Sequence, residues 1–205
     1  MALQQAQVGP ISSTAAGVNT ALRSGQLGDL VVSELHGRYY EQTYRKNVFH
    51  SFHQGVALPL VGTAMTGAIL WNGSSTVNLV LLKVSLQVTV TSATMTGVAL
   101  ARLSGQVSAP TTTTAATATG NNFINGSASA GTAYNIGTVV GTPTLMFPIL
   151  HNTAAIATTG IDSVVMDFEG SIVVPPQSLI CLAALGAASA AAAATIGLMW
   201  EEVPV

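Results

Sequence analysis

Hydrophobic and polar residues alternate most regularly between residues 80 and 91. Every second position there is apolar, and Lys, Ser, Gln and Thr fill most of the positions between them. A period of two is typical of a strand that is buried on one face. This stretch therefore predicts the clearest strand of the protein, followed by a turn at residues 94–97 and a partner strand from residue 98 to residue 102.

Shorter runs of the same kind occur on both sides of this stretch. They cover residues 56–60, 68–71, 136–140, 144–149, 161–169, 178–185 and 194–202. Turn signals separate several of them, among them Asn72-Gly73 and Pro175-Pro176. About eight short strands, with almost no amphipathic helix between them, predict an antiparallel β-sandwich or barrel.

Two segments lack this alternation. Residues 1–28 are rich in Gln, Ser, Ala and Gly without periodicity, which predicts an extended N-terminal arm, with a disordered terminus as the alternative. Residues 104–135 are rich in Thr, Ala, Gly and Ser and predict a long loop. Loops of this length are uncommon in compact domains and are usually functional or mobile. The expected organisation is an arm over residues 1–28 and one β-domain over residues 29–205.

Residues 178–200 carry no charge and are long enough to cross a membrane. Most of the middle of this run is alanine, which is close to neutral on transfer into lipid, and no Lys or Arg flanks it. We expect two strands joined by a small-residue loop instead of a membrane helix. The first ten residues have neither a basic region nor a long apolar run, so we expect no secretory signal.

The composition narrows the classes of protein further. Hydrophobic residues make up 49% of the 205 residues, whereas charged residues make up only 7% and the net charge is -2. This balance excludes charge-rich disorder and coiled coils, and it argues against a basic nucleic-acid-binding protein. So little charge gives little repulsion between copies. The composition therefore suits a protein whose surface is covered by neighbours in an assembly.

Motifs for nucleophilic catalysis and phosphate binding are absent, since neither Gly-x-Ser-x-Gly nor Gly-x-x-x-x-Gly-Lys occurs. The single cysteine, Cys181, permits no internal disulfide and lies in an apolar run, where a buried thiol is expected. His50 and His53 have a spacing that metal ligands can use, but an interface or surface role is the simpler interpretation. We expect no metal and no cofactor.

Asp167 and Glu169 are the one carboxylate pair that alternation would place on the same face of a strand. Paired carboxylates carry out glycoside hydrolysis, so a hydrolase stays open as an alternative. The simpler interpretation is that charges on a strand edge discourage wrong pairing. Calcium binding is another minor alternative, although this region lacks the alternating aspartates of a calcium loop.

Residues 23–53 contain half of the charged residues and three of the four histidines. Their Tyr and Arg side chains form the most specific-looking feature of the chain, because both residue types are enriched at protein interfaces. The predicted interface residues are Arg38, Tyr39, Tyr40, Tyr44 and Arg45. The alternatives are tyrosines that cap the core of the sandwich and a stacking platform for single-stranded nucleic acid.

Three segments carry a resemblance to a known class of protein: Glu34–Gln42 (ELHGRYYEQ), Leu70–Gly73 (LWNG) and Gly170–Ser178 (GSIVVPPQS). From about residue 30 to its end, the chain resembles virion structural proteins of tailed bacteriophages. It is most similar to their jelly-roll head decoration, or cement, proteins. The Pro-Pro-x-Ser turn before a late strand also occurs in other trimeric jelly rolls, including tumour-necrosis-factor-like and fibre-head domains.

The resemblance implies an all-β, jelly-roll-like antiparallel sandwich with an extended N-terminal arm, and no catalytic residues. It implies a homotrimer on the exterior of a virion capsid, made in the host cytoplasm, with the major capsid protein as its partner and neither nucleic acid nor membrane. The alternative is the receptor-binding head of a phage tail fibre or spike, which would bind cells through loops such as residues 105–135. A glycoside hydrolase is the third hypothesis.

Overall fold

The structure is a computed structural model, and it describes residues 39, 42–43, 45–62, 64–90, 95–112, 128–151, 163–186 and 192–205. The chain divides into two units, Met1–Glu41 and Gln42–Val205. Nearly all of the first unit, and with it the predicted arm at residues 1–28, lies outside the described residues. The arm and the domain boundary at residue 28 therefore stay predictions.

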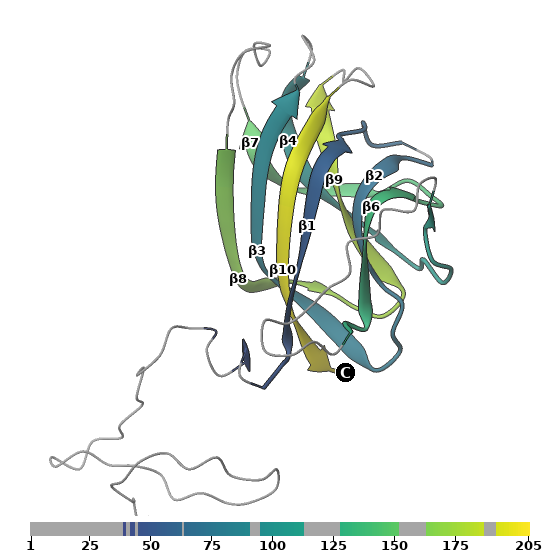
Figure 1. Cartoon of the computed structure of the whole chain (residues 1–205). Helices are drawn as coiled ribbons and strands as arrows, with labels where there is room; N and C mark the ends of the chain where they lie inside the picture. The colour runs from purple at the N-terminus through teal and green to yellow at the C-terminus, as the bar shows by residue number, and fades with distance from the viewer. Residues whose placement is uncertain are drawn as a thin grey trace, which may run out of the picture. The chain divides into compact units, whose positions relative to one another are not determined.

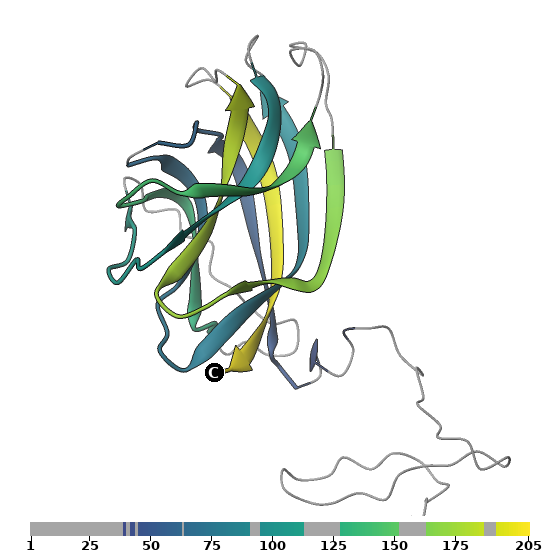
Figure 2. The ribbon, with the colours of Figure 1, turned by 180° about the vertical axis from the view of Figure 1, so that it is seen from behind.

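The second unit consists of β-strands that form two sheets. The strands are β1 Val48–Ala57, β2 Thr66–Asn72, β3 Val77–Val90, β4 Met95–Ser104, β5 Thr111–Thr112, β6 Gly131–Thr138, β7 Thr144–His151, β8 Ser163–Val174, β9 Ser178–Gly186 and β10 Ala193–Pro204. One sheet has the order β1-β10-β3-β8 and the other the order β5-β6-β2-β9-β4-β7. All the strand pairs within these sheets are antiparallel, and the sheets face each other as a sandwich (Figures 1 and 2).

The strand order identifies the sandwich as a jelly roll. Strands that follow each other along the chain lie in opposite sheets at β1 and β2, β3 and β4, β7 and β8, and β9 and β10. Eight strands wound in this way make the two Greek keys of a jelly roll. Strands β5 and β6 belong to an insertion that widens the second sheet beyond β2. The predicted all-β, jelly-roll-like sandwich is confirmed.

The main hydrophobic core fills the space between the sheets and includes the stacked rings of Phe49 and Trp200, whose centroids lie 6.2 Å apart. A second, smaller core covers the outer face of the six-stranded sheet, where Met65 and Val139 from the connections pack over β9. Strand β9 is therefore buried on both faces. This position explains why its sequence is almost continuously apolar instead of alternating.

Cys181 belongs to that second core, which confirms the expected buried thiol. Burial raises the pKa of this thiol to about 12, because the surroundings disfavour a thiolate. Its Sγ lies 3.9 Å from Met65 Sδ and 3.8 Å from the carbonyl oxygen of Ala101. The side chain fills space and stays protonated at neutral pH.

Strand β3 is confirmed, but its first part is registered differently from the predicted alternation. A bulge at Leu82 shifts the pairing with both neighbouring strands, so that Leu79 and Leu81 face the core and Val80 is only half-buried. From Leu82 onward the predicted face is buried. A bulge adds one residue to one strand, and alternation in the sequence does not reveal where this happens.

Strand β6 begins at Gly131, inside the predicted loop at residues 104–135 and five residues before the predicted start at Ile136. Small residues are required here by close packing: a Cβ on Gly131 would lie 2.5 Å from Leu79 Cδ1, and one on Gly137 would lie 2.8 Å from Ile69 Cδ1. Gly131 suits this close packing, and in the sequence it made the start of the strand resemble a loop.

The Asn72-Gly73 turn does not close a hairpin, because β2 and β3 lie in different sheets. Instead, buried Asn72 fixes the corner between them. Its Nδ2 donates to the carbonyl oxygens of Val77 and Val174, both at 2.9 Å, and its Oδ1 accepts from the Ser74 amide at 3.1 Å. One side chain therefore joins the end of β2, the start of β3 and the end of β8.

The uncharged run at residues 178–200 forms β9 and the first part of β10, as expected from its sequence. In the part of the chain that the structure describes, no helix has the length and apolarity needed to span a membrane.

Candidate assembly surface

Strands β7 and β8 are edge strands of the two sheets, and they lie side by side on the same side of the sandwich (Figures 1 and 2). The ring of Phe147 on β7 meets the ring of Phe168 on β8 edge to face, with centroids 5.5 Å apart. This contact closes the sandwich between its two sheets on that side. Aromatic pairs in this geometry add to the hydrophobic gain of burial.

An open groove lies where β7 and β8 approach the ends of β4 and β9. Its walls are formed by Arg102 and Leu103 of β4, Met146 of β7, Val173–Pro175 at the end of β8 and Ser178–Ile180 of β9. Apart from the Arg102 guanidinium, the side chains named here are uncharged. The groove is therefore lined mostly by apolar side chains, with Ser104, Ser178 and one cation also on its walls.

Large apolar side chains on the groove wall and on neighbouring segments are partly exposed to solvent. We call the set the groove patch, and its members are 39% to 68% exposed: Val107, Val140, Leu145, Met146, Phe147 and Val173. The connecting residues are held next to the groove, since the Gln106 amide donates to the Gln177 carbonyl at 2.7 Å and a Cβ on Gly141 would lie 3.2 Å from Leu103 Cδ2. Apolar side chains gathered in this way mark interaction surfaces.

The sequence of β7 explains its exposure. The pairing of β7 with β4 slips twice, so Met146 and Ile149 have no partner residue on β4. Bulges twist an edge strand away from its neighbour, and Pro148 removes one backbone donor from the edge. As a result, Thr144 to Pro148 are all exposed, although three of these residues are large and apolar.

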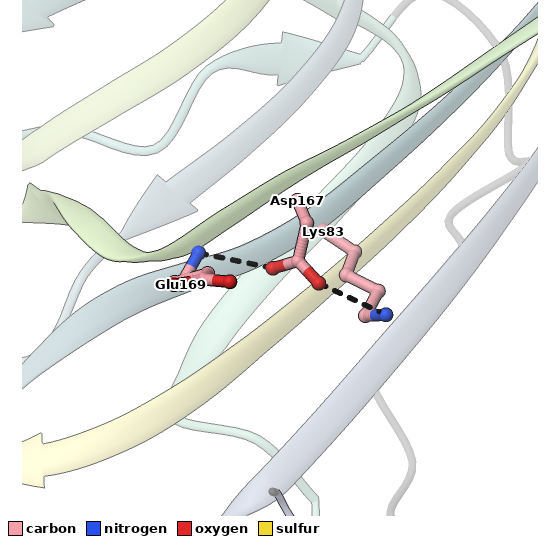
Figure 3. A network of polar contacts seen from close by, with 3 residues as sticks. All are labelled: Lys83, Asp167 and Glu169. Atoms are coloured by element: carbon pink, nitrogen blue, oxygen red, sulfur yellow. Dashed lines mark hydrogen bonds and ion pairs between the residues drawn. The ribbon is translucent and has the colours of Figure 1, made fainter.

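The two carboxylates of the hydrolase hypothesis lie on a distorted part of β8 (Figure 3). Asp167 forms an ion pair with Lys83 at 3.1 Å, and its Oδ1 accepts from the Glu169 amide at 3.1 Å. Glu169 and Gly170 have φ values of +50° and +85°. Asp167 and Glu169 are both exposed and Phe168 between them is buried, as the predicted placement on one face requires, although the strand becomes irregular at Glu169. The Asp167 side chain stabilises the bulge.

The two histidines whose spacing metal ligands can use, His50 and His53, lie on opposite faces of β1. His53 is fully buried between the sheets, where its Nε2 lies 2.9 Å from Ser51 Oγ and its Nδ1 lies 2.6 Å from Asn135 Oδ1. Burial lowers the pKa of His53 below its ordinary value, and the hydrogen bond to Asn135 opposes this only in part. His50 is half-buried on the opposite face of β1. Among the described residues, no three His, Cys, Asp or Glu side chains converge on a metal position.

The Ser51–His53–Asn135 arrangement has the hydrogen-bond order of a catalytic triad. Ser51 is nevertheless 4% exposed and His53 is fully buried, so the serine hydroxyl faces packed side chains instead of a cleft. A nucleophile must reach a substrate carbonyl, which these positions do not permit. The cluster is best understood as a satisfied polar network within the core.

The predicted Tyr and Arg interface is described only in part. Tyr39 is half-buried and Arg45 is exposed, whereas Arg38, Tyr40 and Tyr44 lie outside the described residues. That site stays a prediction. The groove patch was not predicted, although one signal was present: Leu145-Met146-Phe147 puts three apolar residues in a row in a predicted strand, and an edge strand cannot bury all of them.

Comparison of the chain with protein-family models, with curated proteins and with solved structures finds no match. The fold and the groove patch are therefore the observations on which a function can be argued.

Proposed function

We propose that the protein is a non-enzymatic structural protein of a virus particle. In this proposal it is a capsid decoration protein that forms a homotrimer and stabilises the shell from outside by bridging major capsid subunits. The proposal combines the resemblance of its sequence to phage head proteins with the properties of its surface.

The groove patch carries the proposal. A soluble monomer that exposed the six large apolar side chains of the groove patch would associate with other molecules, because burying such surface is favourable. Only 7% of the residues of the chain are charged, so electrostatic repulsion opposes such association weakly. Both properties suit a protein that works while it is covered by neighbours.

The jelly-roll topology is compatible with this function. Viral capsid proteins use the fold repeatedly, and its closed pattern of strands gives a rigid unit that can be packed side by side. The same fold also serves lectins and cupins, so topology alone does not select the function. The surface and the sequence resemblance support the assembly function proposed here.

A decoration protein stabilises its shell by binding the assembled form and not the dissociated subunits. The free energy of that binding is added to the stability of the shell without any change in the contacts between capsid subunits. A catalytic residue is not needed for this function. Apolar contacts and a threefold arrangement of identical subunits are sufficient.

The test uses the purified full chain and empty shells assembled from the major capsid protein of the same virus. The protein is expected to co-sediment with the shells to saturation and to raise their dissociation temperature. Unassembled capsid protein and shells of an unrelated virus are the controls. Absence of saturable co-sedimentation, or equal binding to the unrelated shells, would overturn the proposal.

A further inference from the structure

We infer that copies of this chain associate head to tail, with Phe52 of one copy seated in the groove of the next. The inference rests on the proposed function, because it specifies how the proposed homotrimer is held together. It starts from an aromatic side chain that lies far from the groove patch on the same molecule.

Phe52 is 63% exposed and projects from β1 into solvent. Its neighbours Ser51 and His53 are buried on the core face, so alternation directs the ring to the outer face of the four-stranded sheet. The residue opposite on β10 is Gly197, which offers no side chain to cover the ring. Among the described aromatic residues, Phe52 is the exposed one outside the groove patch.

The groove offers three kinds of contact that suit an aromatic ring. The Arg102 guanidinium can lie over the face of a ring, and the thioether of Met146 can contact its edge. Val173 and Pro175 add apolar surface to the wall of the groove. An aromatic anchor in a depression of this chemistry is typical of the residues that dominate the energy of protein interfaces.

The topology prevents a chain from inserting its own Phe52. Strand β1 is one edge of the four-stranded sheet and β8 is the other, with β10 and β3 between them. Phe52 and the groove therefore lie on opposite sides of one molecule, and the occupant must be a second copy. A contact between two different surfaces of identical chains is heterologous, and it closes into a ring when the rotation between copies permits.

Three variants test this arrangement in the full chain. Phe52→Asp removes the anchor, and Met146→Asp places a charge in the groove, with Val173→Asp as a second groove variant. Each contact in a head-to-tail ring uses one anchor and one groove, so each variant alone is expected to have the mass of a single chain. Light scattering after size-exclusion chromatography measures that mass at a concentration where the unchanged chain is oligomeric.

Mixing the anchor variant with a groove variant gives the decisive result. The Phe52→Asp chain keeps an intact groove and the Met146→Asp chain keeps an intact Phe52, so one contact can form between them. The mixture is expected to contain a species of twice the chain mass that does not grow further. A symmetric contact between two identical surfaces would not produce this species.

Val165→Asp is the matched control, because Val165 is 68% exposed on β8 and belongs neither to the groove nor to the groove patch. It should keep the mass of the unchanged chain, and circular dichroism should show β-structure in all variants. If the anchor and groove variants keep the unchanged mass, or if their mixture stays monomeric, the inference is wrong.

The proposed function can survive that failure. An oligomer that is insensitive to Phe52→Asp and Met146→Asp but still saturates shells overturns the head-to-tail contact alone. A chain that is monomeric and does not bind shells overturns both.

Discussion

His53 is a fully buried ionisable group, so its protonation affects stability. In the folded protein the two ring nitrogens of His53 contact the neutral side chains of Ser51 and Asn135. Both of these hydrogen-bond partners are uncharged, so neither is a carboxylate that would favour the charged ring. Burial lowers its pKa below the ordinary value of 6.5. The unfolded chain therefore binds a proton at this position more readily than the folded protein does, and this difference destabilises the folded protein in acid.

We expect the free energy of unfolding to fall as the pH drops through and below the ordinary histidine value of 6.5. The slope from one such group cannot exceed about 1.4 kcal/mol per pH unit. Urea unfolding at about pH 7.5 and about pH 5.5 measures the change. Burial also raises the pKa of Glu201, which acts in the opposite direction, so the comparison needs a variant.

His53→Gln supplies that comparison. The variant should be less stable at neutral pH but should lose the share of the pH dependence that belongs to His53. The matched control is His151→Gln, because His151 is exposed and its change should leave the dependence intact. An unchanged pH dependence in His53→Gln would contradict the assignment.

Asn72 contributes through three hydrogen bonds at the corner between the sheets. Asn72→Ala removes the donor to the Val77 and Val174 carbonyls and should cost roughly 2–4 kcal/mol of stability, because buried acceptors are then left unsatisfied. Thermal and urea unfolding measure the loss. The control variant is Asn78→Ala, whose side chain is half-buried on β3, and it should cost less than about 1 kcal/mol. Equal losses would show that the corner bonds contribute nothing specific.

At the scale of the strands, the bulge in β8 depends on backbone conformations that glycine adopts best. Gly170 has a φ of +85°, and a Cβ there would lie 3.1 Å from Val80 Cγ1. Gly170→Ala should therefore destabilise the protein by about 1–2 kcal/mol. Gly62→Ala is the control, since a Cβ at Gly62 would have no atom within 4 Å. Matching unfolding midpoints for the two variants would refute the role of the bulge.

The strands that could be predicted from the sequence are those with one buried face and no packing constraint on side-chain size. Alternation located β3, β8 and β10 because most of their inward positions carry large apolar side chains. It missed the start of β6, because Gly131 must be small where the backbone approaches Leu79. It also missed the bulge at Leu82, which changes pairing without changing the residue pattern.

The order of the strands in the sheets could not be predicted from the sequence, because the jelly-roll pairings join strands far apart in the chain. Strand β1 pairs with β10, and Phe49 meets Trp200 across nearly the whole domain. The groove patch depends on that order, because β7 and β8 become neighbours only when the two sheets face each other. A sequence pattern could indicate exposed apolar residues on β7 but not the groove beside them.

At the scale of the whole molecule, the low charge of the chain predicts a protein that assembles with neighbours. The Tyr and Arg residues near residue 40 remain the second predicted contact. Tyr40→Ala combined with Tyr44→Ala should weaken self-association or shell binding, because two aromatic anchors are lost. The matched control replaces both with Phe, which keeps the rings. Unchanged association in the alanine variant would remove these residues from the interface.

The most direct test of the central claim, that this is a self-assembling structural protein, is the native mass of the purified full chain. Size-exclusion chromatography with light scattering should give one species of about 62 kDa, three times the chain mass of 20.8 kDa. The mass should change little with salt, because the groove patch is apolar and salt screens only charges. A single species of 20.8 kDa at every concentration would contradict the claim.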